Sequence, residues 1–352
     1  MKTRRLAITL GLAALVTSLL IFAAARVKQP AAPEKNPPAA AGEYRISGPH
    51  THENLTVFLV HGPERLSGKV PLTLQEALER KQVIVHETSN VNELTIENVS
   101  PTEEVFVQAG DIVKGGRQDR CLTVDLILPP KSGKVPIAAY CVEQGRWSQR
   151  GREAAANFSS SDSRLATKDL KIAGLGKGKS QGEVWSKVEE AQVKLSANAG
   201  ASARAAESPS SLQLTLENKQ VQQLTDGYIK SLAAITERQP DVIGYAFAIN
   251  GKINSADVYG SVALFQKLWP KLLRASAVEA VAELQKGAPP PEPVTAEMIA
   301  TFLAQSEQGR PAERSVTERV KNVVRETDQH LLLEAHDLSK GGRLIHRNYL
   351  KK

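Results

Sequence analysis

Residues 242–259 read VIGYAFAINGKINSADVY, two strand-forming runs that meet at Asn250-Gly251. Asn-Gly supplies the positive φ angles that a two-residue type I′ turn requires. The run before the turn is almost wholly apolar, and the run after it continues to Tyr259. The sequence therefore predicts an antiparallel β-hairpin, and the neighbouring elements decide what this hairpin packs against.

A helix is predicted on each side of this hairpin. The first carries apolar residues at spacings of three and four from Val221 to Ile235 and ends before Pro240. The second spans 261–284, and Pro270 inside it is expected to kink or divide it. Two shorter helices are expected over 183–195 and 294–303. We therefore expect a helix–hairpin–helix second part, and three further strands form an expected C-terminal β tail at 315–326, 331–337 and 343–350.

The region from Tyr44 to Arg150 is predicted to be rich in β-structure. Short strand-like runs separated by turn residues lie at 55–60, 83–87, 94–98 and 105–109, and a short helix at 72–80. The expected fold class is α+β, with an antiparallel sheet or sandwich in this region.

Five parts are expected along the chain. They are a signal peptide or membrane anchor, a Pro/Ala tether, a β-rich domain, a linker loop and an α/β part, at 1–25, 26–43, 44–150, 151–182 and 183–352. The linker is expected to be a long surface loop, or a loop that carries a short element around 165–172. The α/β part is expected either as a separate domain or as one compact unit with 44–150.

The N-terminus has the composition of an export or anchor segment. Lys2, Arg4 and Arg5 precede an uncharged run from Leu6 to Ala25, and about 20 apolar residues in a helix span the roughly 30 Å core of a bilayer. The run fits a cleaved signal peptide and an uncleaved transmembrane anchor equally well. Both place the rest of the protein outside the cytoplasm, as a membrane-anchored, periplasmic or secreted protein of the bacterial envelope.

The charge pattern and the histidine spacing argue against several classes of function. The formal charge is +7, and three basic residues of the N-terminal segment account for three of these charges, which leaves +4. This mild, interspersed charge does not indicate a nucleic-acid partner. The glycine-rich stretch 174–179 follows no clear strand and is interpreted as a linker, not a phosphate-binding loop. No histidines show metal-ligand spacing, so no metal is expected, and the sequence identifies no cofactor.

Two polar motifs lie where apolar strands meet loops. They are GGRQDR at 115–120 and CVEQGRW at 141–147. Two strand-like runs, 121–128 and 135–142, separate them and are joined by a turn-like stretch at 129–134. The motifs are therefore expected to meet at the open end of one hairpin.

The register of that hairpin predicts which residues face one another. With its centre near Ser132, Gln118 lies opposite Arg146 and Cys121 lies opposite Glu143. The two cysteines of the chain, Cys121 and Cys141, then share one face at a diagonal. A disulfide and two buried free thiols are equally open for them, and a nucleophilic Cys141 is a third, weaker alternative.

The sequence resembles a known family in these motifs. The stretches GDIVKGGRQDR at 110–120 and CVEQGRW at 141–147 resemble sequences of the ARPP-1 family. The family name abbreviates "ADP-ribosylglycohydrolase and rhodanese-phosphatase associated". GYAFAINGK at 244–252, DVYGS at 257–261 and LFQKLW at 264–269 add to a resemblance that covers roughly 44–284. The family name implies association with ADP-ribose and phosphate-ester metabolism, and it implies no particular reaction.

Two classes of function are open from the sequence. In the first, the domain binds or processes a small anionic ligand of the nucleotide or sugar-phosphate class. Glu143 is then the general acid or base, and Gln118 orients the substrate as the second catalytic residue. The expected ligand-binding set comprises an arginine clamp, glycines that allow close approach, and their polar and aromatic neighbours: Arg120, Arg146, Gln144, Gly115, Gly116, Asp119 and Trp147.

In the second class, the same motifs form a buried Arg–Glu network that holds a sheet corner and binds nothing. The protein is then a non-enzymatic envelope module that holds a protein partner. A concave pocket at the motifs would favour the first class, and a filled corner would favour the second. The sequence leaves open whether the protein is an enzyme.

Overall fold

The computed structural model describes residues 39–66, 68–88, 90–146, 150, 158–176, 180–289 and 291–352. Residues 38–352 form one compact unit, and residues 1–37 are assigned to another. The expected signal or anchor run, 6–25, lies outside the described residues. Among the residues that are described, no helix is both long and apolar enough to cross a membrane.

The largest sheet has nine antiparallel strands in the order β1-β2-β3-β13-β14-β18-β17-β16-β15. Its N-terminal strands are β1 (Ala39–Ala41), β2 (Tyr44–His52) and β3 (Leu55–His61). Its C-terminal strands are β13 (Val242–Ile249), β14 (Lys252–Tyr259), β15 (Pro311–Ser315), β16 (Val320–Glu326), β17 (His330–Asp337) and β18 (Arg343–Lys351). A short 3₁₀ helix, Leu338–Lys340, joins the last two. Pairing of β3 with β13 unites the two ends of the described chain in one sheet.

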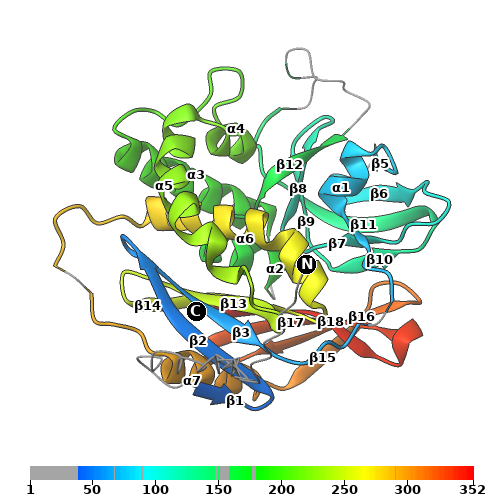
Figure 1. Cartoon of the computed structure of the whole chain (residues 1–352). Helices are drawn as coiled ribbons and strands as arrows, with labels where there is room; N and C mark the ends of the chain where they lie inside the picture. The colour runs from blue at the N-terminus through cyan, green and yellow to red at the C-terminus, as the bar shows by residue number, and fades with distance from the viewer. Residues whose placement is uncertain are drawn as a thin grey trace, which may run out of the picture. The chain divides into compact units, whose positions relative to one another are not determined.

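The predicted hairpin is confirmed as β13 and β14, with Asn250-Gly251 as its turn. Every residue of β13 is buried, because both faces of the sheet are covered. Tyr245 and Phe247 pack on the side of α6 (Val262–Ala282), and Ala246 and Ala248 pack on the side of α7 (Ala296–Ser306). Figure 1 shows α7 and α6 on opposite sides of this sheet. Burial on both faces is the physical reason for a strand without alternation.

Helix α6 is the centre of the layer on the inner face of the large sheet. It runs through Pro270 as one element, so the expected division of this helix does not occur. Most of its residues are buried, and tertiary packing of this kind offsets the hydrogen bond that proline removes. Around it lie α2 (Lys168–Leu175), α3 (Gln181–Ala199), α4 (Leu212–Leu216), α5 (Lys219–Leu232) and the 3₁₀ turn Ala233–Thr236.

Two smaller sheets share a second core with α1 (Leu74–Glu79). Thr73 and Glu76 cap that helix reciprocally, as a capping box. The six-stranded sheet has the order β12-β8-β9-β11-β6-β5. Its strands are β5 (Val83–Glu87), β6 (Glu93–Asn98), β8 (Asp111–Gly115), β9 (Arg120–Leu122), β11 (Gly133–Cys141) and β12 (Phe158–Arg164). The three-stranded sheet contains β4 (Leu72–Thr73), β7 (Val105–Val107) and β10 (Leu126–Leu128).

The register expected for the motif-bearing strands is wrong by three residues. In the structure, β9 and β11 pair Cys121 with Tyr140 and Arg120 with Cys141, so Glu143 is not opposite Cys121. The reason is that the run 121–128 is not one strand. It breaks after Leu122, and β10 leaves the six-stranded sheet to pair with β7. The strand-forming composition of the run did not reveal this change of sheet.

The two cysteines lie on neighbouring strands, as predicted, but they do not share a face. Cys121 and Cys141 are paired with adjacent ladder positions, Tyr140 and Arg120, and adjacent positions point to opposite sides of a sheet. Both thiols are buried and free, so the free-thiol alternative is confirmed. Burial raises the pKa of both thiols, which makes them poor nucleophiles.

Two stretches that were expected to be irregular contain regular elements. The expected tether includes β1, which pairs with β2. The expected linker loop 151–182 includes β12, which was not expected, and α2, which overlaps the short element allowed around 165–172. The sequence of β12, FSSSDSR, has almost no apolar residues. Its backbone pairs with β8, and its side chains make polar contacts with helix α4, where Ser161 Oγ donates to Gln213 Oε1 at 2.7 Å. A strand that buries polar groups lacks the apolar alternation by which strands are recognised.

Candidate functional site

The predicted convergence of the two motifs is present, although the register differs. Gln118 donates from Nε2 to the backbone carbonyl of Glu143 at 2.9 Å, and the Asp119 amide donates to Glu143 Oε2 at 3.1 Å. Arg120 Nη1 reaches Gln118 Oε1 at 3.2 Å. Arg146 Nε meets Glu143 Oε1 at 2.7 Å. With Arg150, these residues form what we call the motif cluster: Gln118, Asp119, Arg120, Glu143, Arg146 and Arg150.

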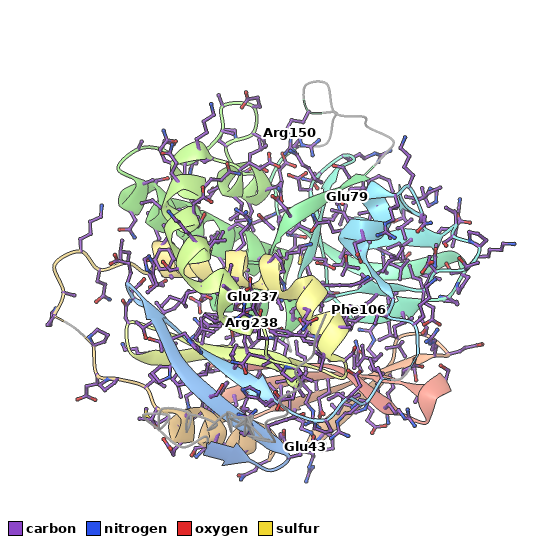
Figure 2. All side chains as sticks on the ribbon, viewed as in Figure 1. Glu43, Glu79, Phe106, Arg150, Glu237 and Arg238 are labelled. Carbon is purple, nitrogen blue, oxygen red and sulfur yellow. The ribbon has the colours of Figure 1, made fainter. Side chains whose placement is uncertain are left out.

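Arg150 is the member that the sequence motifs did not include. Its Nη1 lies 2.8 Å from Asp119 Oδ2 and 3.2 Å from Glu143 Oε1. It also donates to Ser211 Oγ at 3.2 Å, and Ser211 caps the N-terminus of α4. Figure 2 shows Arg150 beside α4. Arg150 therefore ties both motifs to the helical layer.

The motif cluster is buried and its charges balance. Asp119 and Glu143 are fully buried, and Arg120 is 1% exposed. Three arginines face three carboxylates, since Glu87 lies 3.6 Å from Arg120 Nη2. Burial raises the pKa of Asp119, and Arg150 only partly offsets this. For Glu143 burial acts in the same direction, but hydrogen bonds from Arg146 and other donors outweigh it and lower its pKa.

The other predicted site residues have different roles around this cluster. Gly115 and Gly116 give their carbonyls to Arg146, at 3.3 and 3.1 Å. Gly116 has φ +56, and a Cβ there would lie 2.4 Å from the Phe158 ring, so packing alone requires glycine. Gln144 is exposed and lines a separate cavity of about 150 Å³ with α3 residues. Trp147 lies outside the described residues.

We predict that Arg150→Gln destabilises the fold strongly. Removing one partner of a buried ion pair costs about 3–5 kcal/mol, because the other charge stays buried and unpaired. The matched control is Arg204→Gln, whose 3.4 Å contact with Glu189 is solvent-exposed and contributes about 0–1 kcal/mol. Denaturant unfolding measures both. Equal free energies of unfolding for the two variants would show that the buried ion pairs of Arg150 stabilise the fold no more than the exposed ion pair of Arg204.

A second polar group, larger and less obvious, lies between the large sheet and α6. At its centre, His346 of β18 bridges two carboxylates. Its Nδ1 lies 2.7 Å from Asp125 Oδ2, and its Nε2 lies 3.0 Å from Asp257 Oδ1. Phe106, labelled in Figure 2, packs against the same ring edge-on. Burial lowers the pKa of His346, but the two carboxylates outweigh it and raise the pKa to about 9.

Five further charged residues surround this bridge. Lys271 Nζ meets Asp111 Oδ1 at 2.9 Å, and Arg164 Nη1 lies 3.7 Å from Asp257 Oδ1. Burial raises the pKa of Asp257, but Arg164, Lys171 and His346 outweigh it and lower the pKa well below its usual value. We call the whole group the central cluster: Asp111, Asp125, Arg164, Lys171, Asp257, Lys271, Glu279 and His346.

The central cluster is less saturated with hydrogen bonds than the motif cluster, in which Arg120 Nε is the buried atom without a partner among the described residues. Several buried atoms have no hydrogen-bond partner in the described part of the chain: Arg164 Nε and Nη1, Asp257 Oδ2, Ser255 Oγ, Asn254 Oδ1 and Glu279 Oε2. Buried polar groups in native proteins are nearly all partnered, so such a concentration needs an explanation. Unpartnered groups of this kind gather where water or a ligand is bound.

One member of the central cluster, Glu279, lines a surface cavity. This cavity of about 300 Å³ lies between α2, α3, the end of α6 and the β13–β14 turn, and we call it the α2–α6 cavity. Glu279 and Asn254 belong both to its lining and to the group with unpartnered atoms. Glu279 Oε1 accepts from Asn254 Nδ2 at 2.9 Å and from the Lys168 amide, at the start of α2, at 2.8 Å.

A β-bulge explains how Asn254 comes to face α6. Phe247 pairs with Ser255 and Ala248 pairs with Ile253, so Asn254 is the extra residue on β14. A bulge turns a side chain that regular alternation would point elsewhere. Asn254 thereby joins Ser255 and Asp257 on the side of the strand that faces α6.

Sequence reasoning missed the central cluster, although a signal exists. Its eight members come from seven separate segments, and none forms a local motif. Lys171, Asp257 and Glu279 each interrupt an apolar stretch, in LKI, ADV and VEAV. A charge in a buried stretch marks a position that must find a partner or a function. Among the described residues, no group of three or more His, Cys, Asp or Glu is arranged to hold a metal ion.

Comparison with known protein families shows the family to which this chain belongs. The model of the ARG and Rhodanese-Phosphatase-superfamily-associated Protein domain, ARPP-1, matches residues 43–350. The chain belongs to the ARPP-1 family. The ARPP-1 domain thus extends past the resemblance seen at 44–284 and includes the C-terminal strands that carry His346. No curated protein and no solved structure matches this chain.

We predict that the stability of this ARPP-1 domain carries a pH dependence from His346. Its pKa in the folded chain, about 9, lies above the unfolded value near 6.5. The protonated ring therefore stabilises the fold fully below about pH 6.5, and this contribution is lost as the pH rises through about 9. The shift corresponds to about 3 kcal/mol.

The measurement compares the parent with His346→Gln from pH 6 to pH 10. The gap in unfolding free energy between the two proteins should be widest at pH 6 and should narrow as the pH rises. A gap that stays constant across this range would show that the ring is not held as an imidazolium.

Proposed function

We propose that this ARPP-1 domain binds a small anionic ligand of the nucleotide or sugar-phosphate class in the α2–α6 cavity. The observation that carries the proposal is a concave space lined by four lysines, two of which have no carboxylate at ion-pair distance among the described residues: Lys168, Lys187, Lys194 and Lys252. Four acidic residues line the same space: Asp169, Glu190, Glu279 and Glu283. A volume of about 300 Å³ lies at the lower end of the range for small-molecule sites. It suits a sugar phosphate or a mononucleotide.

The lysines divide into two kinds. Lys187 and Lys194 are held by Glu190 and Glu283, at 2.9 and 2.6 Å. Lys168 and Lys252 have no ion-pair partner within the described ranges, so their ammonium groups remain available to an anion.

This proposal places the ligand away from the residues that the sequence favoured. Arg120 and Arg146 already face carboxylates and carbonyls, and the motif cluster has no surplus of positive charge. Glu143 and Gln118 are likewise engaged with each other and with Asp119. The balanced, buried network supports a structural role for both motifs.

A second candidate function follows from the same observation. A domain whose polar motifs are structural is compatible with a non-enzymatic envelope module that holds a protein partner. The two candidates differ in the α2–α6 cavity, which only the first one uses.

We predict that ribose 5-phosphate and AMP raise the thermal midpoint of the domain by a few degrees. A ligand at about 100 times its Kd adds about 2.7 kcal/mol to the unfolding free energy. Lys168→Ala and Lys252→Ala should each lose most of this stabilisation while folding normally. Lys134→Ala, at an exposed position of β11, is the matched control and should respond like the parent. An unchanged response in both cavity variants would contradict the proposal.

We also propose that residues 6–25 export or anchor the domain. The support is the uncharged run behind Arg4 and Arg5. Mass spectrometry of the N-terminus, on membrane and soluble fractions, should find either an intact membrane-bound chain or a chain that begins after the apolar run. An intact chain in the cytosolic fraction would refute the proposal.

A further inference from the structure

A serine, a histidine and an aspartate form a hydrogen-bonded row near one edge of the large sheet. Ser47 Oγ lies 2.6 Å from His61 Nε2, and His61 Nδ1 lies 2.8 Å from Asp241 Oδ1. Arg45 Nη2 donates to the second carboxylate oxygen of Asp241 at 2.8 Å. None of these residues belongs to either buried cluster. With these contacts a histidine can take a proton from a hydroxyl while a carboxylate holds its other nitrogen.

We propose that Ser47 is a nucleophile that hydrolyses carboxylic esters, with His61 as its general base and Asp241 as the residue that positions His61. This inference goes beyond the proposed function, because none of the three residues lines the α2–α6 cavity. The substrate class is an ester whose acyl carbon approaches the edge of the sheet beside β2.

Three consecutive strands of the sheet place the three residues together. Leu59 on β3 pairs with Ser47 on β2, and His61 lies two residues further along β3. His61 is therefore the diagonal neighbour of Ser47 on the same face of the sheet, within reach of a long side chain. Val242, the first residue of β13, pairs with His61, and Asp241 directly precedes it. The row is thus held by strands, which position side chains more precisely than loops do.

The hydrogen bonds determine which nitrogen of the neutral ring carries the proton. An ionised carboxylate only accepts hydrogen bonds, so the Nδ1 of His61 that meets Asp241 must donate. The Nε2 atom then has a lone pair and accepts from the Ser47 hydroxyl. Burial raises the pKa of Asp241, but hydrogen bonds from His61 and Arg45 outweigh it and lower the pKa below its usual value. The carboxylate therefore stays charged and keeps the ring in the tautomer that a general base needs.

The exposure of the side chains fits these roles. His61 is 2% exposed, so water competes little for its ring, whereas Ser47 is only half-buried. Ile46 is the last residue of β2 that pairs with β1, and beyond it the outer edge of β2 pairs with no strand of the described chain. Figure 1 shows β2 continuing past β1 along this edge. An extended acyl group can therefore approach Ser47 from the open edge of the sheet.

The backbone of β2 is irregular directly after Ser47. The ladder with β3 shifts after this residue and resumes at His50, so Gly48 and Pro49 form a bulge. Gly48 has φ +114, and a Cβ there would lie 3.1 Å from the Val57 carbonyl oxygen, so this position requires glycine. Bulges are frequent next to active sites, where they interrupt strand pairing and turn side chains. The interruption therefore lies at the residue that would react.

The reaction consumes only the ester and water. Ser47 Oγ attacks the acyl carbon, and its proton passes to His61 Nε2. The bond between the acyl carbon and the alcohol oxygen breaks, the alcohol takes that proton, and the acyl group remains on Ser47. Water then gives a proton to His61 and attacks the acyl carbon, the carboxylic acid leaves, and the proton returns to Ser47.

The test is labelling of the full chain with diisopropyl fluorophosphate, which phosphorylates activated serines with loss of fluoride. Peptide mass spectrometry maps the adducts. We expect labelling of Ser47 at least about 100-fold faster than that of the exposed serines, the lower end of what a positioned general base contributes. The parent should also hydrolyse p-nitrophenyl butyrate, and Ser47→Ala should lose both reactions. Thr51→Ala is the matched control on the same strand, because the Thr51 hydroxyl meets the hydroxyl of Thr56 at 3.0 Å and should behave like the parent.

The base and the positioning residue are tested by the rate of labelling. His61→Gln should slow the labelling of Ser47 by about 100-fold or more. Asp241→Asn should also slow it while the fold is retained, and Asp241→Glu, which keeps the carboxylate, should recover part of the rate. An aspartate with a structural role alone would change the thermal midpoint and leave the rate of labelling of the folded protein unchanged.

The outcomes separate this inference from the proposed function. Labelling that follows exposure along the chain, with Ser47 no faster than other serines, would overturn the proposal, and so would labelling that His61→Gln leaves unchanged. Labelling of Ser47 without turnover of the ester would refute the hydrolysis. If His61→Gln fails to fold, the adducts of the parent and the rate for Asp241→Asn decide the matter. Ser47→Ala should keep the response to ribose 5-phosphate, because the α2–α6 cavity is a different site.

Discussion

The carboxylate of Asp257 is the constraint on which the central part of this fold depends. It is fully buried in a strand whose two faces are covered, so it remains ionised only where cations and donors meet it. His346 and Asn348 supply hydrogen bonds at 3.0 Å, and Arg164 adds a positive charge. These partners come from β18 and β12. The requirement to satisfy one charge thus fixes how the C-terminal strands and the polar strand β12 are placed around the hairpin.

The domain contains two buried polar networks that differ in a way that matters for function. In the motif cluster every charge meets an opposite charge or a carbonyl, and such a network stabilises one arrangement of loops and strands. In the central cluster, several donors and acceptors are left without a partner in the described part of the chain. A protein interior tolerates this only where something else, water or ligand, completes the bonds. The motif residues are therefore hydrogen-bonded almost throughout, whereas the central cluster keeps several buried atoms without a partner among the described residues.

Sequence reasoning succeeded where the physics is local. The Asn250-Gly251 turn, strand β5 and helix α1 depend on turn angles, apolar alternation and a cap, all of which lie within a few neighbouring residues. Prediction from the sequence failed where the residues that determine a strand's pairing lie elsewhere in the chain. The register of β9 and β11 is set by the departure of β10 to another sheet. Strand β12 is formed from polar residues because its partners are polar, and no periodicity within it shows this.

The sequence by itself determined the central hairpin, the family and the meeting of the two motifs. Each follows from the conformational propensity of neighbouring residues, from the spacing of apolar residues, or from a short motif within one segment of the chain. The tertiary structure alone decided that the cysteines face opposite sides of a sheet and that the motif charges balance one another. It alone brought residues from Asp111 to His346 into one cluster beside a cavity. The reason is that electrostatic and steric satisfaction of a buried group is a property of its neighbours in space, and those neighbours come from segments that the chain order keeps far apart.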